Sequence, residues 1–133
     1  MSNIILEKAN KNIYDDYIQL LKEFKIINSR TKHLAEEIKV ILIACESESD
    51  RERKVREMTV SDVRPKQFVQ KYLTFQYTKD QWRRIVEHFI RQEYDLTEAE
   101  IKKATNDIVK EFTRRAPTTM SGFKSHLAIY MSR

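Results

Sequence analysis

Apolar residues recur at steps of three or four along most of this 133-residue chain, which is the spacing that lines one face of an α-helix. The pattern is clearest at the start of the chain, where charged residues fall between the apolar positions. We therefore predict a helix over about residues 3–27. Its inward face consists of Leu6, Ala9, Ile13, Tyr17, Leu20, Phe24 and Ile27.

A second helix is predicted after Asn28 and Ser29, because their side-chain oxygens can accept hydrogen bonds from the free N–H groups of a first helical turn. Its second half, Val40–Cys45, is apolar on every side and partly β-branched, so a short buried strand is the alternative. We prefer the helix because no helix breaker precedes the run. A segment that is apolar all round belongs at the centre of a core. The inward positions are Leu34, Ile38, Ile41 and Cys45.

The next stretch, residues 46–56, reads ESESDRERKVR and has eight charged residues among eleven. Its apolar residues do not recur at helical spacing. The sequence therefore predicts a charged linker or a frayed helix end between an N-terminal helix pair and a C-terminal helical half. The alternative is a basic arm that contacts a partner, although the carboxylates between its cations offset much of its positive charge. The cations of such an arm are Arg51, Arg53, Lys54 and Arg56.

Two capping boxes mark helix starts in the C-terminal half of the chain. Thr78 with Gln81 predicts a helix over about residues 79–93, and Thr97 with Glu100 predicts another that extends to about residue 115. A short helix over about residues 65–73 precedes them, because Pro65 suits a first helical turn.

Pro117 ends the helix that begins near Thr97, since proline disfavours helical geometry in the residue before it. A last helix follows over about residues 119–131. Its apolar positions are Met120, Phe123, Leu127 and either Tyr130 or Met131.

Five or six helices with short connections predict an all-α fold, a single compact bundle in one domain covering residues 1–133. Gly122 is the only glycine, which disfavours a β-rich fold built on tight hairpins. It also excludes the glycine-rich phosphate loops of P-loop and Rossmann proteins.

The residue types that carry out catalysis or bind metals form no recognisable motif. Cys45 has no partner for a disulfide, and the three histidines, His33, His88 and His126, are far apart in the sequence. We therefore predict a protein that is not an enzyme and that has no metal and no cofactor. No apolar run reaches the roughly 18 residues of a membrane helix, and no signal peptide is recognisable. These observations predict a soluble, cytoplasmic protein.

The net charge of +5 is not spread evenly. Residues 97–133 contain seven basic and four acidic side chains, residues 47–73 contain seven and five, and the remaining segments are neutral. After Glu111 there is no acidic residue. This end of the chain suits contact with phosphates, although solvation of a helical surface is the simpler explanation of the charge. Its cations are Arg114, Arg115, Lys124 and Arg133.

Two helix pairs in the C-terminal half could form a helix-turn-helix unit, residues 65–73 with 78–94 and residues 97–115 with 119–131. The later pair is the better candidate because its second helix, residues 119–131, contains no carboxylate that would repel the phosphates of DNA. Neither pair has the glycine often found in the turn, so a plain αα-hairpin is the alternative.

Aromatic and basic residues alternate over residues 68–82, which is a pattern that can bind single strands by stacking. Core packing explains most of these rings, because they share helix faces with aliphatic residues. Phe75 and Tyr77 fall between helices and are the best candidates for stacking.

The leading hypothesis is therefore a non-enzymatic protein, which could be a homodimer, that binds nucleic acid, DNA rather than RNA, through its basic C-terminal third in a regulatory or replication-accessory role. The alternative is a helical protein–protein interaction module, an adaptor or inhibitor that docks through Phe123, Leu127 and Tyr130. The predicted nucleic-acid contacts are Arg114, Arg115, Thr119, Ser121, Lys124, Ser125, His126 and Arg133.

Overall fold

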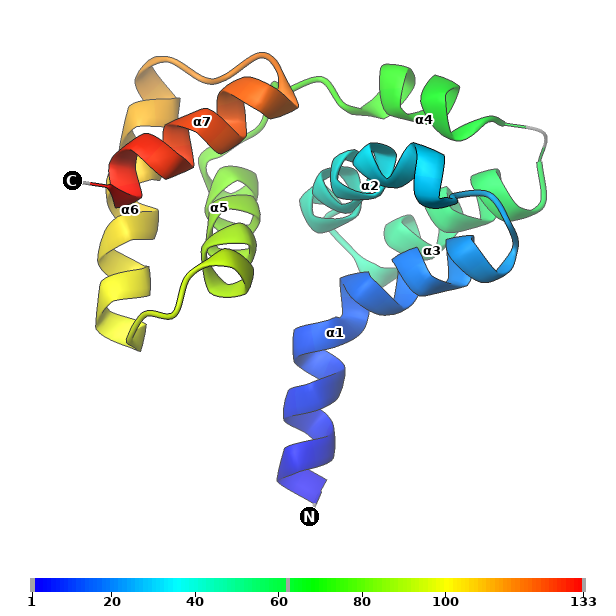
Figure 1. Ribbon diagram of the computed structural model, residues 1–133, viewed down its shortest axis with the longest axis horizontal. Coiled ribbons are helices and arrows are strands. Elements are labelled where there is room, and N and C mark those ends of the chain that lie inside the picture. The colour runs from blue at the N-terminus through cyan, green and yellow to red at the C-terminus, as the bar shows by residue number, and fades with distance from the viewer. Residues whose placement is uncertain (1, 62, 133) are drawn as a thin grey trace. The chain divides into compact units, whose positions relative to one another are not determined.

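The computed structural model describes the backbone of residues 2–61 and 63–132, and the side chains of these ranges from residue 13 onward (Figure 1). Its regular secondary structure in these ranges is helical, which confirms the all-α class. The first inward positions predicted for the N-terminal helix, Leu6 and Ala9, lie outside the described side chains. The elements are α1 (Ser2–Glu23), the 3-10 turn η1 (Ser29–Thr31), α2 (Lys32–Ala44), α3 (Glu48–Thr59), α4 (Pro65–Tyr72), α5 (Lys79–Glu93), α6 (Glu98–Arg114) and α7 (Met120–Met131).

Contacts along the chain divide it into two compact units, Met1–Leu73 and Thr74–Arg133. The first unit contains α1 to α4, and the second contains α5 to α7. The described residues thus form seven α-helices, where the sequence predicted five or six. The additional helix is α3.

The first helix ends four residues earlier than predicted, because the chain turns at Lys25, where φ is +60°. The N–H of Ile26 donates to the carbonyl of Leu21 at 2.9 Å, and the N–H of Lys25 donates to that of Lys22 at 3.0 Å. These are the two bonds of a Schellman motif. Glycine is the usual residue at its left-handed position, since a Cβ there costs about 1–2 kcal/mol. The turn directs Ile27 into the core, where it is 1% exposed.

The apolar run Val40–Cys45 belongs to α2 as far as Ala44, so the strand alternative is wrong. Every residue of the run is buried, as its composition predicted. From α2, Ile38, Ile41 and Leu42 join the core cluster of the first unit. The other buried members of that cluster are Ile18, Leu21, Ile27, Leu34, Val55, Met58, Phe68 and Val69.

The charged stretch at residues 46–56 is not a linker, because most of it lies in α3. The Ser47 hydroxyl caps this helix by accepting a hydrogen bond from the N–H of Asp50 at 3.1 Å. Only Val55 and Met58 of α3 are buried. Two buried positions are too few to produce an apolar period, which is why the hydrophobic pattern missed the helix.

Three of the four cations of this stretch have partners within the fold, which weakens the contact-arm alternative, whereas Arg56 is exposed. Arg53 and Lys54 lie 2.5 Å and 3.0 Å from the same carboxylate oxygen of Asp50. Arg51 donates its Nε to the carbonyl of Leu42 at 3.0 Å. Ion pairs between residues three and four apart stabilise a helix whose apolar face is small.

Asp50 is expected to stabilise α3 in a pH-dependent way. Hydrogen bonds first from Arg53 and then from Lys54 hold the pKa of its carboxyl below the ordinary value. A lowered folded-state pKa gives stability that is present above the unfolded-state pKa of about 4 and is lost as the pH falls through the folded-state pKa. We expect Asp50→Asn to lower the free energy of unfolding at pH 7 by about 0.5–1 kcal/mol.

Urea unfolding of the parent and the Asp50→Asn variant at pH 7 and at decreasing pH measures this effect. The difference between the two proteins should narrow below about pH 4, where the parent carboxylate becomes protonated. Glu52→Gln, an exposed carboxylate of the same helix, is the control and should show a smaller difference. An Asp50→Asn difference that does not change with pH would contradict the ion-pair explanation.

In the second unit, the predicted capping boxes are confirmed. The Thr78 hydroxyl accepts from the N–H of Gln81 at 3.2 Å, and the Gln81 side chain accepts from the N–H of Thr78 at 2.8 Å. Thr97 and Glu100 repeat this exchange at 3.2 Å and 2.9 Å. Thr119 caps α7 by accepting from the N–H of the third residue of that helix at 2.9 Å. All three helices of this unit therefore have a threonine as the N-cap residue.

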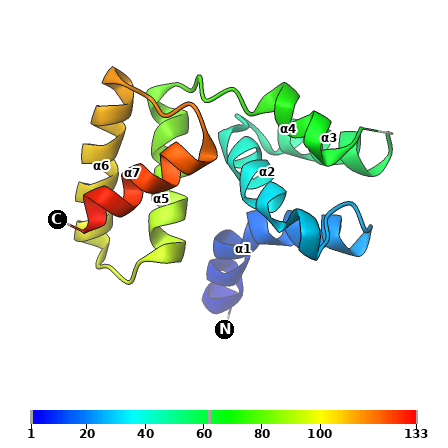
Figure 2. The ribbon, with the colours of Figure 1, turned by 45° about the horizontal axis from the view of Figure 1, so that its top comes forward.

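Aromatic rings form the centre of the second unit, where α7 crosses α5 and α6 (Figures 1 and 2). The ring centroid of Phe123 lies 6.0 Å from that of Trp82, 5.3 Å from Phe89 and 5.9 Å from Phe112. Phe75 is 6% exposed and stacks on Trp82. Of the two rings suggested for base stacking, Phe75 is thus part of the core, and Tyr77 is half-buried with its ring edge against Trp82.

Candidate nucleic-acid interface

Several residues predicted to contact DNA serve the fold instead. The Thr119 hydroxyl oxygen accepts the capping hydrogen bond of α7. The His126 ring packs edge-on against Phe112, with 5.1 Å between the ring centroids. Lys124 Nζ lies 2.9 Å from a carboxylate oxygen of Glu93. Each of these three side chains therefore has a partner within the fold, and their contact with nucleic acid stays a prediction.

The other predicted contacts divide into exposed residues and one that the structure does not describe. Arg114, Arg115, Ser121 and Ser125 are exposed. Arg133 lies outside the described residues. The structure therefore retains two adjacent arginines at the end of α6, but it does not place a cluster of free cations on α7.

As a recognition helix, α7 lacks the positive charge that would hold it against phosphates. Lys124 is its only lysine or arginine, and Glu93 balances that charge. The exposed residues Ser121, Ser125 and Ile129 carry no charge. Cations and hydrogen-bond donors are needed along a helix that enters a major groove. The prediction that α7 reads DNA therefore has no electrostatic support.

The anchors of the alternative, protein-docking hypothesis also belong to the fold. Phe123 and Leu127 are fully buried in the second unit. The Tyr130 hydroxyl donates to a carboxylate oxygen of Asp107 at 2.5 Å. Docking through Phe123 and Leu127 would require α7 to leave its own core, which the structure gives no reason to expect.

Neither helix pair is identified as a helix-turn-helix. The helices of the earlier pair, α4 and α5, belong to different compact units. The later pair, α6 and α7, packs through Phe112 and Phe123. Such packing is common to helix hairpins in general.

The exposed side of α6 presents an aligned set of cations. Lys103, Lys110 and Arg114 are all exposed. With 3.6 residues per turn they lie within about 20° of one line and span about 16 Å along the helix axis. Arg115 is exposed directly after the helix. We call these four residues the α6 basic stripe.

The carboxylates beside the stripe have local hydrogen-bond or ion-pair partners. Asp107 accepts from the Tyr130 hydroxyl at 2.5 Å. Glu100 accepts from the N–H of Thr97, and this backbone hydrogen bond holds the pKa of the Glu100 carboxyl below its ordinary value. Glu111 lies 3.8 Å from Arg114, whose side chain is still 78% exposed.

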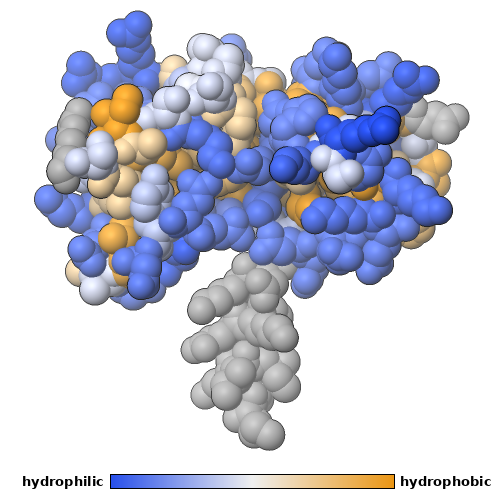
Figure 3. Space-filling model, in the orientation of Figure 1, coloured by the Kyte–Doolittle hydropathy of each residue, from blue (hydrophilic) through white to orange (hydrophobic). Residues whose placement is uncertain are grey.

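The other cations of the stripe remain available. In the ranges that the structure describes, no carboxylate lies within ion-pair distance of Lys103, Lys110 or Arg115. Hydrophilic side chains also cover much of the face drawn in Figure 3. The stripe can therefore neutralise anions without first breaking a strong internal ion pair.

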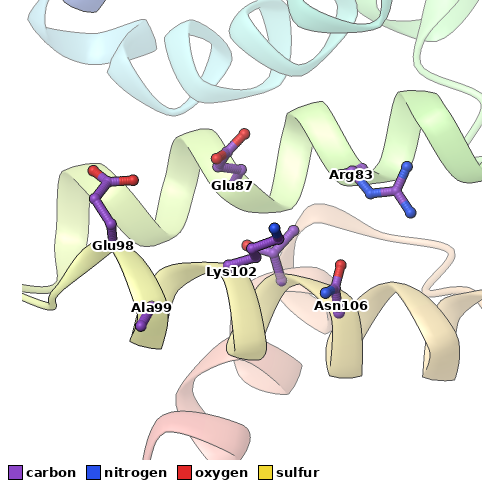
Figure 4. Close-up of a pocket in the computed structure, with 7 residues that line it drawn as sticks. Arg83, Glu87, Glu98, Ala99, Lys102 and Asn106 are labelled. Atoms are coloured by element: carbon purple, nitrogen blue, oxygen red, sulfur yellow. The ribbon is translucent and has the colours of Figure 1, made fainter.

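A groove of about 360 Å³ is lined by residues of both α5 and α6 (Figure 4). The Lys102 side chain lies between the helices, while Arg83 and Asn106 lie toward one end and Glu98 toward the other. Arg91 binds both oxygens of Glu98, at 2.6 Å and 2.8 Å, and one oxygen of Glu87 at 3.0 Å. The groove is lined by Arg83, Glu87, Glu98, Ala99, Lys102, Thr105 and Asn106.

Charges of both signs line this groove in equal number, two cations and two carboxylates. It therefore does not concentrate positive potential, unlike the exposed stripe on the same helix. Thr105 Oγ1 is buried beside it without a hydrogen-bond partner among the described residues. This arrangement suits a water molecule better than a phosphate group.

The described residues form no recognisable site for a catalytic nucleophile or for a metal ion. Burial raises the pKa of the Cys45 thiol to about 11, so the thiol is protonated at neutral pH and is a poor nucleophile. No group of three His, Cys, Asp or Glu side chains gathers as a metal site in the described ranges. Within these ranges, every helix is too short or too polar to cross a bilayer.

No protein-family model, curated protein or solved structure matches this chain significantly. The geometry of each unit is therefore the basis on which we infer a function. Lys103 and Lys110 were not among the residues predicted from the sequence to contact nucleic acid, and the structure adds them to the candidate interface. Their spacing from Arg114, eleven and four residues, was the signal that could have identified them.

Proposed function

We propose that the second unit binds nucleic acid, with duplex DNA as the preferred form, through phosphate contacts made by the α6 basic stripe. The observation that supports this function is the alignment of Lys103, Lys110 and Arg114 on one exposed helix face, continued by Arg115. Cations on such a line can neutralise successive phosphates and release the counterions condensed on DNA.

The proposed binding depends little on base sequence. Thr119 and His126, which the sequence offered for base contacts, have roles within the fold. Contacts to phosphates position a protein on the duplex but carry no direct sequence information. A regulatory or replication-accessory role, without catalysis, fits this mode of binding.

The salt dependence of binding tests the proposal. Four phosphate contacts predict a slope near −3.6 in a plot of log affinity against log salt concentration, at about −0.9 per contact. The slope would be about twice as steep for a dimer that uses both copies of the stripe. Changing Lys103, Lys110 and Arg114 together to glutamine should leave a slope near −0.9. The measurement is fluorescence anisotropy of a short labelled duplex at several salt concentrations.

A matched pair of single variants separates the stripe from net charge. Lys110→Gln and Lys79→Gln remove the same charge from exposed positions of the same unit. Lys110→Gln should make the slope shallower by about 0.9, whereas Lys79→Gln should leave it unchanged. Equal effects of the two variants, or no binding by the parent protein at about 50 mM salt, would refute the proposed interface.

A further inference from the structure

Three lysines of the first unit line one open pocket at the turn between α1 and α2. Its volume is about 660 Å³. No carboxylate is among the described residues that line it, although residues 1–27 and residues 28–46 each contain equal numbers of basic and acidic side chains. The fold therefore concentrates charge that counting by segment does not reveal. The lysine pocket is lined by Lys22, Lys25, Ile27, Asn28, Ser29 and Lys32.

The turn that carries these lysines is fixed by hydrogen bonds and burial. The Schellman bonds close the end of α1 around Lys25. The Asn28 side chain accepts from the N–H of Arg30 at 2.8 Å, and the N–H of Asn28 donates to the Thr31 hydroxyl at 2.9 Å. Ile27, which also lines the pocket, is buried in the core. The lysine side chains therefore extend from a positioned backbone.

The positive charges in the pocket have no counterion among the side chains that the structure describes. Among the described residues, no carboxylate lies within ion-pair distance of Lys22, Lys25 or Lys32. Lys25 also occupies the left-handed position of the turn, where glycine would be less strained. A lysine at that position adds charge to the pocket at a cost in backbone strain.

We propose that the lysine pocket binds adjacent phosphate groups, supplied either by a free phosphate chain or by neighbouring phosphates of a nucleic-acid backbone. Lysine binds phosphate as a compact point charge. Three ammonium groups suit the several negative charges of linked phosphates better than the charge of one carboxylate. The Ser29 hydroxyl and the Asn28 amide add hydrogen-bond donors at the same pocket. This site belongs to the first unit and does not depend on the function proposed for the second.

Pyrophosphate is the probe for the first test, with the full chain at low salt. Titration followed by amide chemical shifts should perturb residues 22–32, and calorimetry should give the affinity. Lys25→Gly and Lys32→Gln should each weaken binding about three- to ten-fold, since each removes one charge-assisted contact. Lys66→Gln removes an exposed charge of the same unit outside the pocket, and should change affinity less than about two-fold.

The Lys25→Gly variant separates binding from folding. Glycine adopts the left-handed geometry of this turn readily, so the melting temperature should be equal to or higher than that of the parent. Weaker pyrophosphate binding by a protein of undiminished stability would support a direct role for the lysine. Equal losses in Lys25→Gly and Lys66→Gln, or the absence of saturable shifts at residues 22–32, would overturn the proposal.

A second titration identifies the source of the phosphates. It uses a short oligonucleotide with the variant that lacks Lys103, Lys110 and Arg114, so that binding at the α6 basic stripe does not contribute. Displacement of pyrophosphate with shifts in the same amides would assign the pocket to a nucleic-acid backbone. Binding of pyrophosphate without displacement would assign it to a free phosphate chain.

Discussion

Phe123→Ala is expected to lower the free energy of unfolding of the second unit by about 3–5 kcal/mol. The ring is fully buried and contacts aromatic rings of both α5 and α6. Truncation removes the apolar contacts and leaves a cavity where the three helices meet. Because small domains are stable by only about 5–15 kcal/mol, this loss is a large fraction of the total.

The single tryptophan of the chain provides the measurement. Trp82 lies in the same unit, and its ring centroid is 6.0 Å from that of Phe123, so its fluorescence reports on this core. In urea, the fluorescence transition of Phe123→Ala should move to much lower denaturant concentration. Ser125→Ala, an exposed change in the same helix, should alter stability by less than about 0.5 kcal/mol. A Phe123→Ala transition at the parent midpoint would mean that the ring does not hold this core together.

Leu42→Asp is expected to unfold the first unit at neutral pH. Leu42 is fully buried in α2 and belongs to the core cluster of that unit. A carboxylate at this position would be removed from water without a cation to pair with it. The cost of such an uncompensated charge is about 3–5 kcal/mol or more, in addition to the lost apolar contacts.

Far-UV circular dichroism and amide spectra of residues 13–73 measure this effect. Leu42→Asp should lose much of the helical signal of the first unit. Leu42→Met preserves size and apolarity and should cost less than about 1.5 kcal/mol, so it controls for the position itself. His33→Ala controls for an exposed site in the same helix. Native-like amide spectra for Leu42→Asp would contradict the placement of Leu42 in the core.

The helices of the second unit were predictable because their starts are encoded locally. Thr78 with Gln81 and Thr97 with Glu100 form the expected capping boxes, so the predicted starts agree with the structure. The start of α3 carries a similar serine cap, but the helix buries only two residues and depends on charge pairs around Asp50. A pattern of apolar spacing does not detect such a helix.

Charge along the sequence was a partial guide to the candidate sites. Arg114 and Arg115 are exposed, in agreement with the absence of acidic residues after Glu111. Lys124 lies in the same acid-free stretch, yet the fold brings Glu93 to it from 31 positions away. The lysine pocket shows the opposite case, since a tight turn gathers cations from two segments that are neutral by count. Pairing between distant residues is a property of the tertiary fold.

The threonine caps of α5, α6 and α7 also bear on how quickly the second unit assembles. Each helix start is specified within four residues, and only short connections, residues 94–97 and 115–119, separate successive helices. Closing such short loops costs little chain entropy. Helical domains dominated by contacts close in sequence fold in microseconds to milliseconds. We therefore expect the second unit to reach its native topology on that timescale, with little time for exposed aromatic surface to drive aggregation.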